Sequence, residues 1–386
     1  MQFPLQQFLK RETPFYHYDM DLLSQTLDSL NQANSYGFKV HYALKANVNP
    51  EILKLIRHKG LGIDCVSGNE VKLALENGFE PNQIVLAGVG KTDKEIAYAI
   101  DHDIFSFNVE SIQELQVIDE IAANKGKRPN VSIRVNPEVE AGTHHYITTG
   151  SKHNKFGITR TELFQNLKLI QALNNIAFIG VHYHIGSQIV DLERFKNLCS
   201  RVNDVQRQLI AHNIPLPHIN VGGGLGIDYE NPDANGIPDF TNYFKLFKDN
   251  LEVLEGQEVH FELGRAIVGQ CGTLVTKVLY NKSSGDVDFL IVDAGMTELM
   301  RPALYQAQHL LENISNPNGN LVKYDVAGPI CESSDFFGKD LELTESKRSD
   351  LIAIRSTGAY GETMRNHYNA RDYALAYFYS HSEAND

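Results

Sequence analysis

The sequence predicts an α/β fold, with a (β/α)8 TIM-like barrel of parallel strands followed by a C-terminal antiparallel β domain. Eight apolar runs alternate with segments of helical periodicity between residues 38 and 263, the pattern of repeated strand–helix units. Most of these runs are apolar without interruption, as expected for parallel strands that are covered on both faces. Beyond residue 265 the helical periodicity gives way to short β-rich runs separated by turn residues.

The barrel strands are predicted, in chain order, at residues 38–44, 61–66, 83–87, 104–109, 131–135, 176–184, 218–221 and 259–263. Segments with helical periodicity lie between them at residues 51–58, 70–77, 94–101, 112–124 and 195–212. The number and spacing of the strands suit a closed barrel. A doubly wound open sheet is the alternative, since periodicity does not show whether a sheet closes.

The last third of the chain is predicted to be β-rich, with strands at residues 267–280, 287–293, 321–326 and 350–355. Surface loops are predicted at 231–238 and 313–320, where Gly, Asn and Pro are frequent. We therefore expect an N-terminal segment at 1–22 whose strand joins the β domain, a barrel at 23–265 and the β domain at 266–386.

The composition argues against several other classes of protein. The chain has 35 Lys and Arg against 48 Asp and Glu, a formal net charge of −13, so we expect no nucleic-acid partner. No apolar run approaches the roughly 18 residues of a membrane-spanning helix, and the first residues lack a secretory pattern. The four cysteines lie far apart, which suits a reducing compartment and gives no structural zinc site. We therefore expect a cytoplasmic enzyme without a membrane partner.

Distinctive motifs follow the predicted strands at the end of a barrel where functional residues gather. Lys45 follows the first strand in the motif H-Y-A-L-K-A-N. A lone lysine is commonly a solvated surface charge, whereas a desolvated lysine is a nucleophile that can form a Schiff base. His182 and His184 follow the sixth strand and share one of its faces. This H-x-H spacing suits a metal pair, a buried hydrogen-bonded histidine or an imidazole against a flat cofactor. No third ligand stands at a suitable spacing, so we expect no metal.

Glycines and charged residues follow the last two strands of the predicted barrel. Three consecutive glycines follow the seventh strand: Gly222, Gly223 and Gly224. Such a run lets backbone N–H groups approach an anion closely, and many barrels bind phosphate after strands seven and eight. Glu262, Gly264 and Arg265 follow the eighth strand. A lysine, a carboxylate and a phosphate cradle are together what pyridoxal 5'-phosphate requires, with Glu262 keeping the ring nitrogen protonated.

At this point the residues resemble the pyridoxal-phosphate-dependent decarboxylases of fold type III, which have an alanine-racemase-type barrel. The resemblance covers nearly the whole chain, and within the family it is strongest to the members that act on diaminopimelate. The motifs that carry it are Y-A-L-K-A-N, R-V-N-P-E-V, N-K-F-G-I, H-I-G-S-Q-I, G-G-G-L-G, E-L-G-R, R-P-A-L-Y, C-E-S-S-D and G-A-Y-G. Their combination is specific, whereas each motif alone is weak.

The resemblance implies a role for each matching residue toward the cofactor. Lys45 would hold pyridoxal phosphate as a Schiff base, His184 would stack on its ring and Glu262 would face the ring nitrogen. The phosphate would be bound by Ser187, Gly222, Gly223, Gly224, Gly264 and the backbone of Arg265. Asp64 and Arg134 are similar to a support network near the lysine, and Tyr360 to a tyrosine that contacts both cofactor and substrate.

The resemblance also implies an amino-acid substrate and a homodimer with shared active sites. Arg265, Arg301 and Tyr305 would bind the distal end of meso-diaminopimelate, which would yield L-lysine and carbon dioxide. Cys331 and Glu332 would be donated across the dimer interface. The proton added to Cα would come from Cys331, with Lys45 as the alternative.

Two departures and three rival functions accompany this resemblance. Leu263 stands where many members have proline, and the segment 293–302 varies around its arginine. A polyamine-pathway decarboxylase, acting on carboxynorspermidine or ornithine, should carry an acidic residue where this chain has R-P-A-L-Y. An alanine racemase is disfavoured by C-E-S-S-D and H-I-G-S-Q-I. A non-catalytic relative that binds only a partner or the cofactor could lose Lys45, Glu262 or Cys331, and this chain keeps all three.

Overall fold

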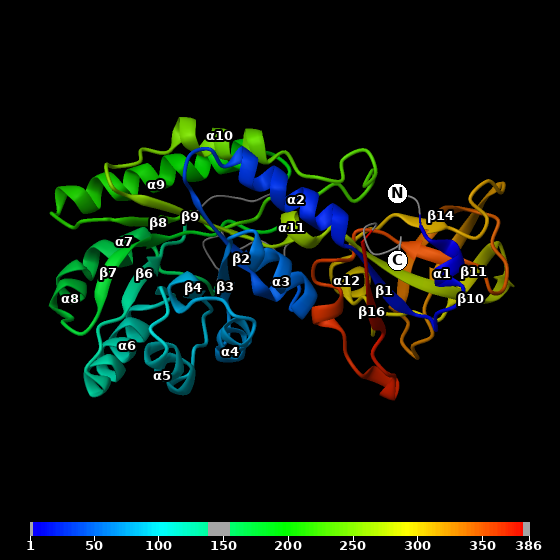
Figure 1. Cartoon of the computed structure of the whole chain (residues 1–386), viewed down its shortest axis with the longest axis horizontal. Helices are drawn as coiled ribbons and strands as arrows, with labels where there is room; N and C mark the ends of the chain where they lie inside the picture. Colours follow the sequence, from blue (N-terminus) through cyan, green and yellow to red (C-terminus); the bar gives the residue numbers. More distant parts are fainter. Residues whose placement is uncertain (1–2, 138–154, 381–386) are drawn as a thin grey trace. The chain divides into compact units, whose positions relative to one another are not determined.

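The computed structural model describes residues 3–137 and 155–380 of the chain. They fall into two compact units, whose elements are labelled in Figure 1. The barrel unit comprises residues 27–226 and 239–264, and the β unit comprises residues 1–26, 227–238 and 265–386. The β unit therefore collects three separate stretches of the chain.

The barrel unit is a closed barrel of parallel strands, which confirms the predicted fold class and excludes the open sheet. Its last strand pairs with its first, with His41 opposite Glu262. The strands are β2 (Lys39–Ala43), β3 (Gly62–Cys65), β4 (Ile84–Leu86), β5 (Ser106–Val109), β6 (Asn130–Arg134), β7 (Ala177–His182), β8 (His218–Asn220) and β9 (Glu258–Leu263). Each lies within two residues of a predicted run, because buried parallel strands are marked by uninterrupted apolar sequence.

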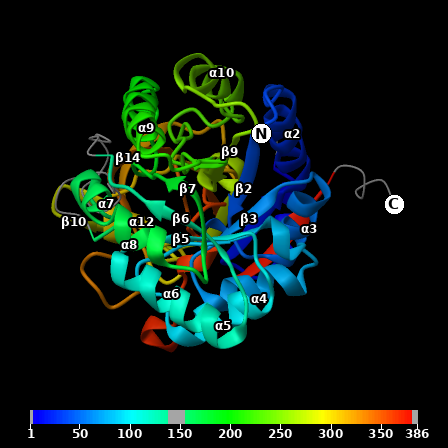
Figure 2. The ribbon, with the colours of Figure 1, turned by 90° about the vertical axis from the view of Figure 1, so that its left-hand side faces the viewer.

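Helices surround the strands of this unit, as Figure 2 shows. The five predicted helices are α3 (Pro50–His58), α4 (Gly68–Glu76), α5 (Asp93–Asp101), α6 (Ile112–Lys125) and α9 (Glu193–Ala211). Three further helices of the barrel unit were not predicted: α7 (Arg160–Gln165), α8 (Leu167–Ala172) and α10 (Phe240–Asn250). The helix α2 (Met20–Ala33), which precedes the first barrel strand, was not predicted either.

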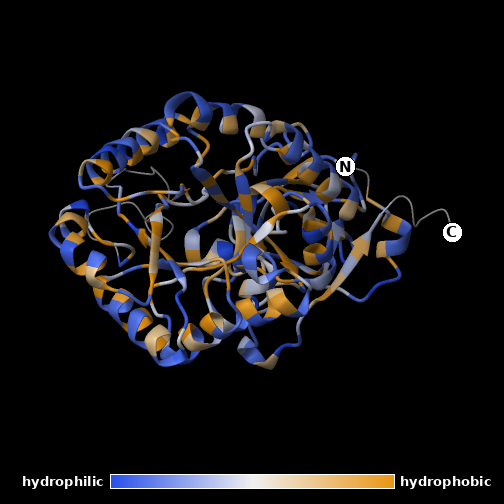
Figure 3. Cartoon of the chain, turned by 60° about the vertical axis from the view of Figure 1, so that its left-hand side comes forward, coloured by the Kyte–Doolittle hydropathy of each residue, from blue (hydrophilic) through white to orange (hydrophobic). Residues whose placement is uncertain are grey.

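The barrel helices begin and bury their faces for local reasons. Thr92 caps α5 by accepting the Glu95 N–H, and Glu95 returns a bond to the Thr92 N–H, a capping box that stabilises the first turn. Along α6 the buried residues are Leu115, Ile118 and Ala122, which share one face of a helix. Figure 3 shows the resulting alternation of apolar and polar residues along the helices.

The β unit is built on a mixed sheet. Its strands are β1 (Phe15–Asp19), β10 (Gly272–Ser284), β11 (Val287–Val292), β12 (Leu311–Asn313), β13 (Leu321–Ala327), β14 (Phe336–Thr344), β15 (Leu351–Ile354) and β16 (Leu375–Tyr379). The N-terminal strand β1 pairs with β10, as expected for a segment that joins this domain. Most pairs are antiparallel, but β1 pairs with β16 and β11 with β13 in parallel. The predicted β domain is therefore confirmed, and its sheet is mixed rather than wholly antiparallel.

Two boundaries in the β unit differ from the sequence prediction. The predicted strand at 267–280 begins with helix α11 (Arg265–Val268), and the strand itself begins only at Gly272. Asn313, placed in a predicted surface loop, ends β12 and is buried, because its side-chain amide donates to Ser346 and Asp350. The remaining helices of the unit are α1 (Leu5–Phe8) and α12 (Arg301–Tyr305), with 3₁₀ turns at Glu362–Met364 and Tyr368–Ala370.

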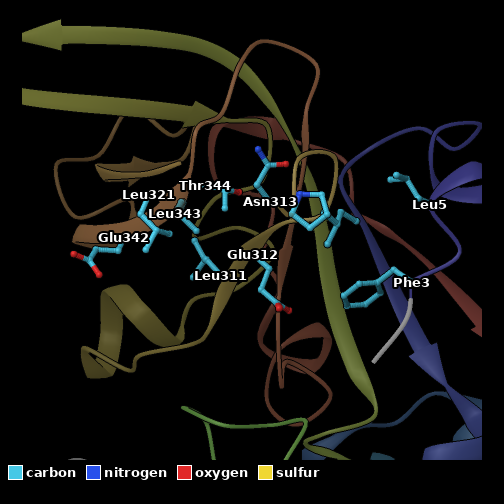
Figure 4. Close-up of a pocket in the computed structure, with 11 residues that line it drawn as sticks. Phe3, Leu5, Leu311, Glu312, Asn313, Leu321, Glu342, Leu343 and Thr344 are labelled. Atoms are coloured by element: carbon cyan, nitrogen blue, oxygen red, sulfur yellow. The ribbon is translucent and has the colours of Figure 1, made fainter. Parts of the chain in front are cut away.

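A cavity of about 480 Å³ opens in the β unit and is shown in Figure 4. Its lining is largely apolar and comes from the N-terminal segment and three strands of the sheet, among them Phe3, Leu311, Leu321 and Leu343. It contains none of the residues predicted to bind cofactor or substrate. In the described part of the chain, no helix combines the length and apolarity needed to cross a membrane.

Candidate active site

Lys45 and Asp64 lie together after the first two barrel strands. Lys45 is in the 3₁₀ turn η1 (Leu44–Ala46) after β2, and its Nζ is 3.9 Å from Oδ2 of Asp64 on β3. The Lys45 side chain is 39% exposed, whereas that of Asp64 is only 1% exposed. Burial raises the pKa of Asp64 well above its usual value, and the charge of Glu262 raises it further. Neither carboxylate oxygen of Asp64 has a hydrogen-bond partner in the described residues. The nearby ammonium of Lys45 is therefore the cation that Asp64 faces.

Glu262 is held at the end of β9 by three side chains from other strands. Its Oε1 accepts from the amides of Asn108 and Asn220, at 2.8 and 2.7 Å. Its Oε2 lies 3.1 Å from Nε2 of His182. Burial alone would raise the pKa of Glu262, but the charge and hydrogen bond of His182 outweigh it and hold the pKa below the ordinary range. Glu262 is thus a fixed, buried carboxylate that suits a protonated ring nitrogen.

The two histidines of the H-x-H motif have different surroundings. Of the three alternatives for this motif, His182 fits the buried hydrogen-bonded histidine, because its Nε2 lies within hydrogen-bond distance of Glu262. Burial lowers the pKa of His184 well below its usual value, and the charges of Arg134 and Lys45 lower it further. The Gly223 N–H donates to Nδ1 of His184 at 3.1 Å. The imidazole is therefore neutral and oriented by the Gly223 N–H, which suits a ring that stacks on a flat cofactor. No group of three or more potential metal ligands occurs among the residues that the structure describes.

The three consecutive glycines are required by close backbone contacts. A Cβ on Gly222 would lie 2.2 Å from the Tyr183 carbonyl oxygen, and one on Gly223 would lie 1.8 Å from that of Glu262. Their N–H groups already donate within the barrel, that of Gly222 to Oδ1 of Asn220 at 2.9 Å and that of Gly223 to His184. The predicted phosphate-binding role of Gly222, Gly223 and Gly224 stays a prediction. Gly224 is the partly exposed member of the three, with φ +111°.

Arg134, at the end of β6, is oriented by a buried ion pair. Its Nη1 lies 2.8 Å from Oε1 of Glu110, and its guanidinium carbon lies 4.6 Å from the centre of the Phe156 ring. The Gly157 N–H donates to the other oxygen of Glu110 at 2.7 Å. These contacts account for Arg134 of the R-V-N-P-E-V motif and for Phe156 and Gly157 of the N-K-F-G-I motif. Their residues Glu138, Val139 and Asn154 lie outside the described residues.

The β unit brings together two buried arginines and two tyrosines. Arg265 follows Gly264 directly and begins α11, and Arg301 begins α12. Arg265 donates from Nη1 to the hydroxyl of Tyr229, and its guanidinium carbon lies 5.0 Å from the Tyr360 ring centre. The guanidinium carbon of Arg301 lies 4.9 Å from the Tyr229 ring centre. Burial lowers the pKa of Arg301, and its Nε is buried without a hydrogen-bond partner among the described residues.

The other predicted site residues have less distinctive surroundings. Ser187 and Tyr305 are partly buried, in the loop after β7 and at the end of α12. Cys331 and Glu332 are exposed in the β unit, and Cys331 is the one exposed thiol of the four free cysteines. The backbone N–H of Cys331 donates to Oδ1 of Asn369 at 2.9 Å.

Five residues of these clusters were not predicted: Asn108 and Asn220 beside Glu262, Glu110 beside Arg134, Tyr229 beside the two arginines, and His309, whose Nε2 lies 2.9 Å from Nη1 of Arg301. The two asparagines could have been found, because each interrupts an apolar strand on the face that points into the barrel. Tyr229 and His309 stand in no recognisable motif, so their roles required the structure.

The barrel and its clusters define a pyridoxal-phosphate enzyme of the decarboxylase class. The family model of the pyridoxal-dependent decarboxylases, for their pyridoxal-binding domain, matches residues 22–269. The chain belongs to this family. Its resident cofactor is pyridoxal phosphate, and the orphaned carboxylate of Asp64 beside Lys45, the fixed Glu262 and the neutral His184 fit that group.

Relatives that are similar over nearly the whole chain are diaminopimelate decarboxylases. That of Bacteroides thetaiotaomicron is 52% identical over 377 residues, which cover 97% of each chain. The crystal structure of the Helicobacter pylori diaminopimelate decarboxylase complexed with L-lysine is 40% identical, with a TM-score of 0.91 over 97% of this chain and 94% of that one. The M. jannaschii diaminopimelate decarboxylase in co-complex with L-lysine is 34% identical, with a TM-score of 0.89 over 98% of this chain and 89% of that one.

Proposed function

We propose that the chain decarboxylates meso-2,6-diaminopimelate to L-lysine and carbon dioxide, the last step of lysine biosynthesis. The choice of this substrate is supported by two buried cations in the β unit, Arg265 and Arg301, which both contact Tyr229. A buried guanidinium binds a carboxylate through strong, charge-assisted hydrogen bonds. Diaminopimelate has a distal carboxylate, whereas ornithine and carboxynorspermidine end in an amine.

Bound pyridoxal phosphate supplies an electron sink for the bond from Cα to the departing carboxylate. Lys45 would hold the cofactor through its amine, which Asp64 faces at 3.9 Å. His184 would lie against the ring. Glu262 would keep a proton on the ring nitrogen, because its carboxylate is fixed by three hydrogen bonds.

Further residues of the chain are proposed to bind the phosphate and the substrate. Ser187 and the glycine run Gly222–Gly224 are proposed to bind the phosphate, together with the backbone of Gly264 and Arg265. The side chains of Arg265 and Arg301, with Tyr305 and Tyr360, are proposed to bind the distal end of the substrate. A proton would then be delivered to Cα by Cys331 or, as the alternative, by Lys45.

We also propose a cytoplasmic homodimer with shared active sites. Cys331 and Glu332 are exposed in the β unit, which suits residues that complete the site of a neighbouring subunit. All four cysteines are free thiols, which suits a reducing compartment.

A substrate panel tests the reaction directly. Carbon dioxide release would be measured from diaminopimelate, ornithine, arginine, lysine and carboxynorspermidine, with Lys45→Ala as the inactive control. Diaminopimelate is expected to have the highest kcat/KM. A higher value for ornithine or carboxynorspermidine would assign the chain to the polyamine branch instead.

A further inference from the structure

Tyr229 belongs to a chain segment that is fixed within the β unit. Residues 227–238 lie between β8 and α10 in sequence but cluster with the β unit. On one side of Tyr229, the Asp228 carbonyl accepts from Nε2 of Gln270 at 2.7 Å. On the other side, Asp233 accepts from Nη2 of Arg355 at 2.6 Å. The position of Tyr229 is therefore set by anchors on both flanks.

The phenol of Tyr229 lies between the two buried arginines. Arg265 donates to its oxygen, and the guanidinium carbon of Arg301 lies 4.9 Å from the centre of its ring. A phenolic oxygen has two acceptor lone pairs and one hydrogen. Because Arg265 donates to one lone pair, the O–H remains as a donor for another group. A tyrosine held in this way can donate a hydrogen bond to an anion, and the guanidinium charges of Arg265 and Arg301 beside it repel a cation.

The surroundings of Arg301 supply a neutral hydrogen-bond partner. Nη1 of Arg301 lies 2.9 Å from Nε2 of His309, and Nδ1 of His309 lies 2.8 Å from the Arg355 carbonyl oxygen. Because a carbonyl can only accept, Nδ1 of His309 carries the hydrogen and Nε2 accepts from Arg301. Burial, followed by the charge of Arg301, lowers the pKa of His309 to about 3, so the imidazole is neutral. The Nε of Arg301, on a side chain nine-tenths buried, still lacks a partner among the described residues.

We propose that Tyr229 is a substrate-positioning residue that holds Arg265 and Arg301 in place and donates its hydroxyl hydrogen to the distal carboxylate. The proposal rests on the function proposed above and adds a residue that determines specificity. A carboxylate can accept hydrogen bonds from all three groups, whereas an ammonium or a methyl group at the same place can accept none. Rejection of substrates that lack the distal carboxylate follows from the cost of unpaired buried donors.

The test compares Tyr229→Phe with wild-type holoenzyme. The phenylalanine keeps the ring between the arginines and removes only the hydroxyl. Loss of one charge-assisted hydrogen bond predicts a KM for diaminopimelate at least about tenfold higher, with kcat within about twofold. Tyr280→Phe is the matched control, because Tyr280 is an exposed tyrosine of β10 that also faces an arginine, Arg348. The control variant is expected to behave as wild type.

An unreactive probe separates this inference from the proposed reaction. Calorimetry would measure the binding of pimelate, a diacid, and hexanoate, a monoacid, to each holoenzyme. Tyr229→Phe is expected to weaken pimelate at least about tenfold and to change hexanoate less than twofold. Unchanged pimelate binding and KM would overturn the inference. Equal weakening of pimelate and hexanoate binding would also overturn it. The same holds for loss of cofactor absorbance or a lower melting temperature, because each of these results indicates a structural role for Tyr229. Failure of the wild-type enzyme to decarboxylate diaminopimelate would refute the proposed function alone.

Discussion

Replacing Glu262 by glutamine removes one buried negative charge and leaves the side-chain volume almost unchanged. The carboxylate has three fixed neighbours, namely Asn108 and Asn220 at Oε1 and His182 at Oε2. The amide of glutamine can keep its oxygen toward the two asparagine amides. Its nitrogen would then face Nε2 of His182, and that histidine can shift its hydrogen to Nδ1, which is buried without a partner among the described residues. We therefore expect Glu262→Gln to fold and to bind pyridoxal phosphate.

The rate should nevertheless fall because a neutral amide does not keep a proton on the ring nitrogen. A hydrogen bond to a charged group contributes about 1.5–3 kcal/mol. If this stabilisation is lost in the transition state, kcat decreases by about ten- to a hundredfold. The assay is carbon dioxide release at saturating diaminopimelate, with cofactor content measured by absorbance on the same sample.

Glu258→Gln is the matched control for this prediction. Glu258 begins the same strand as Glu262, but its side chain is 50% exposed and lies 3.3 Å from His260 rather than in the Glu262 cluster. The control is expected to retain the wild-type rate. A kcat for Glu262→Gln within about twofold of wild type, at full cofactor content, would refute the assignment of Glu262 to the ring nitrogen. Equal losses in both variants would show that any charge on this strand affects the rate.

Three further predictions concern the substrate, the assembly and the pH dependence of stability. Arg301→Ala should raise the KM for diaminopimelate by at least about tenfold with little effect on cofactor affinity. Arg348→Ala, at an exposed arginine, is the control and should change neither quantity. Equal loss of substrate and cofactor affinity in Arg301→Ala would indicate a structural role. Equal amounts of inactive Lys45→Ala and Cys331→Ala subunits, once exchanged, should regain about a quarter of the wild-type active sites, and no recovery would contradict shared sites. Burial lowers the pKa of His309 to about 3, so below about pH 6.5 the unfolded chain binds more protons than the folded one. The free energy of unfolding should therefore fall as the pH drops, by up to about 1.4 kcal/mol per pH unit from this residue. Urea unfolding of wild type and His309→Gln between pH 7 and 5 checks this, and identical pH slopes would disprove it.

The sequence by itself determined the barrel and most of the candidate cofactor-binding residues. Buried parallel strands leave uninterrupted apolar runs, so all eight barrel strands could be located from local sequence. Because the carboxyl ends of these strands meet at one edge, the residues that follow them were expected to gather there. That rule alone places Lys45 beside Asp64, and His184 in the same barrel as Glu262.

The tertiary structure decided which groups contact each other over long sequence separations. Asn108 reaches Glu262 only because the barrel closes, since the two residues are 154 positions apart in the sequence. The parallel pairing of β1 with β16 joins the two ends of the chain, and no local pattern specifies such a partner. Tyr229 meets Arg265 and Arg301 because the segment 227–238 packs with the β unit rather than with the barrel elements that flank it. Local periodicity reports which face of an element is buried, whereas the identity of the partner depends on packing between distant segments.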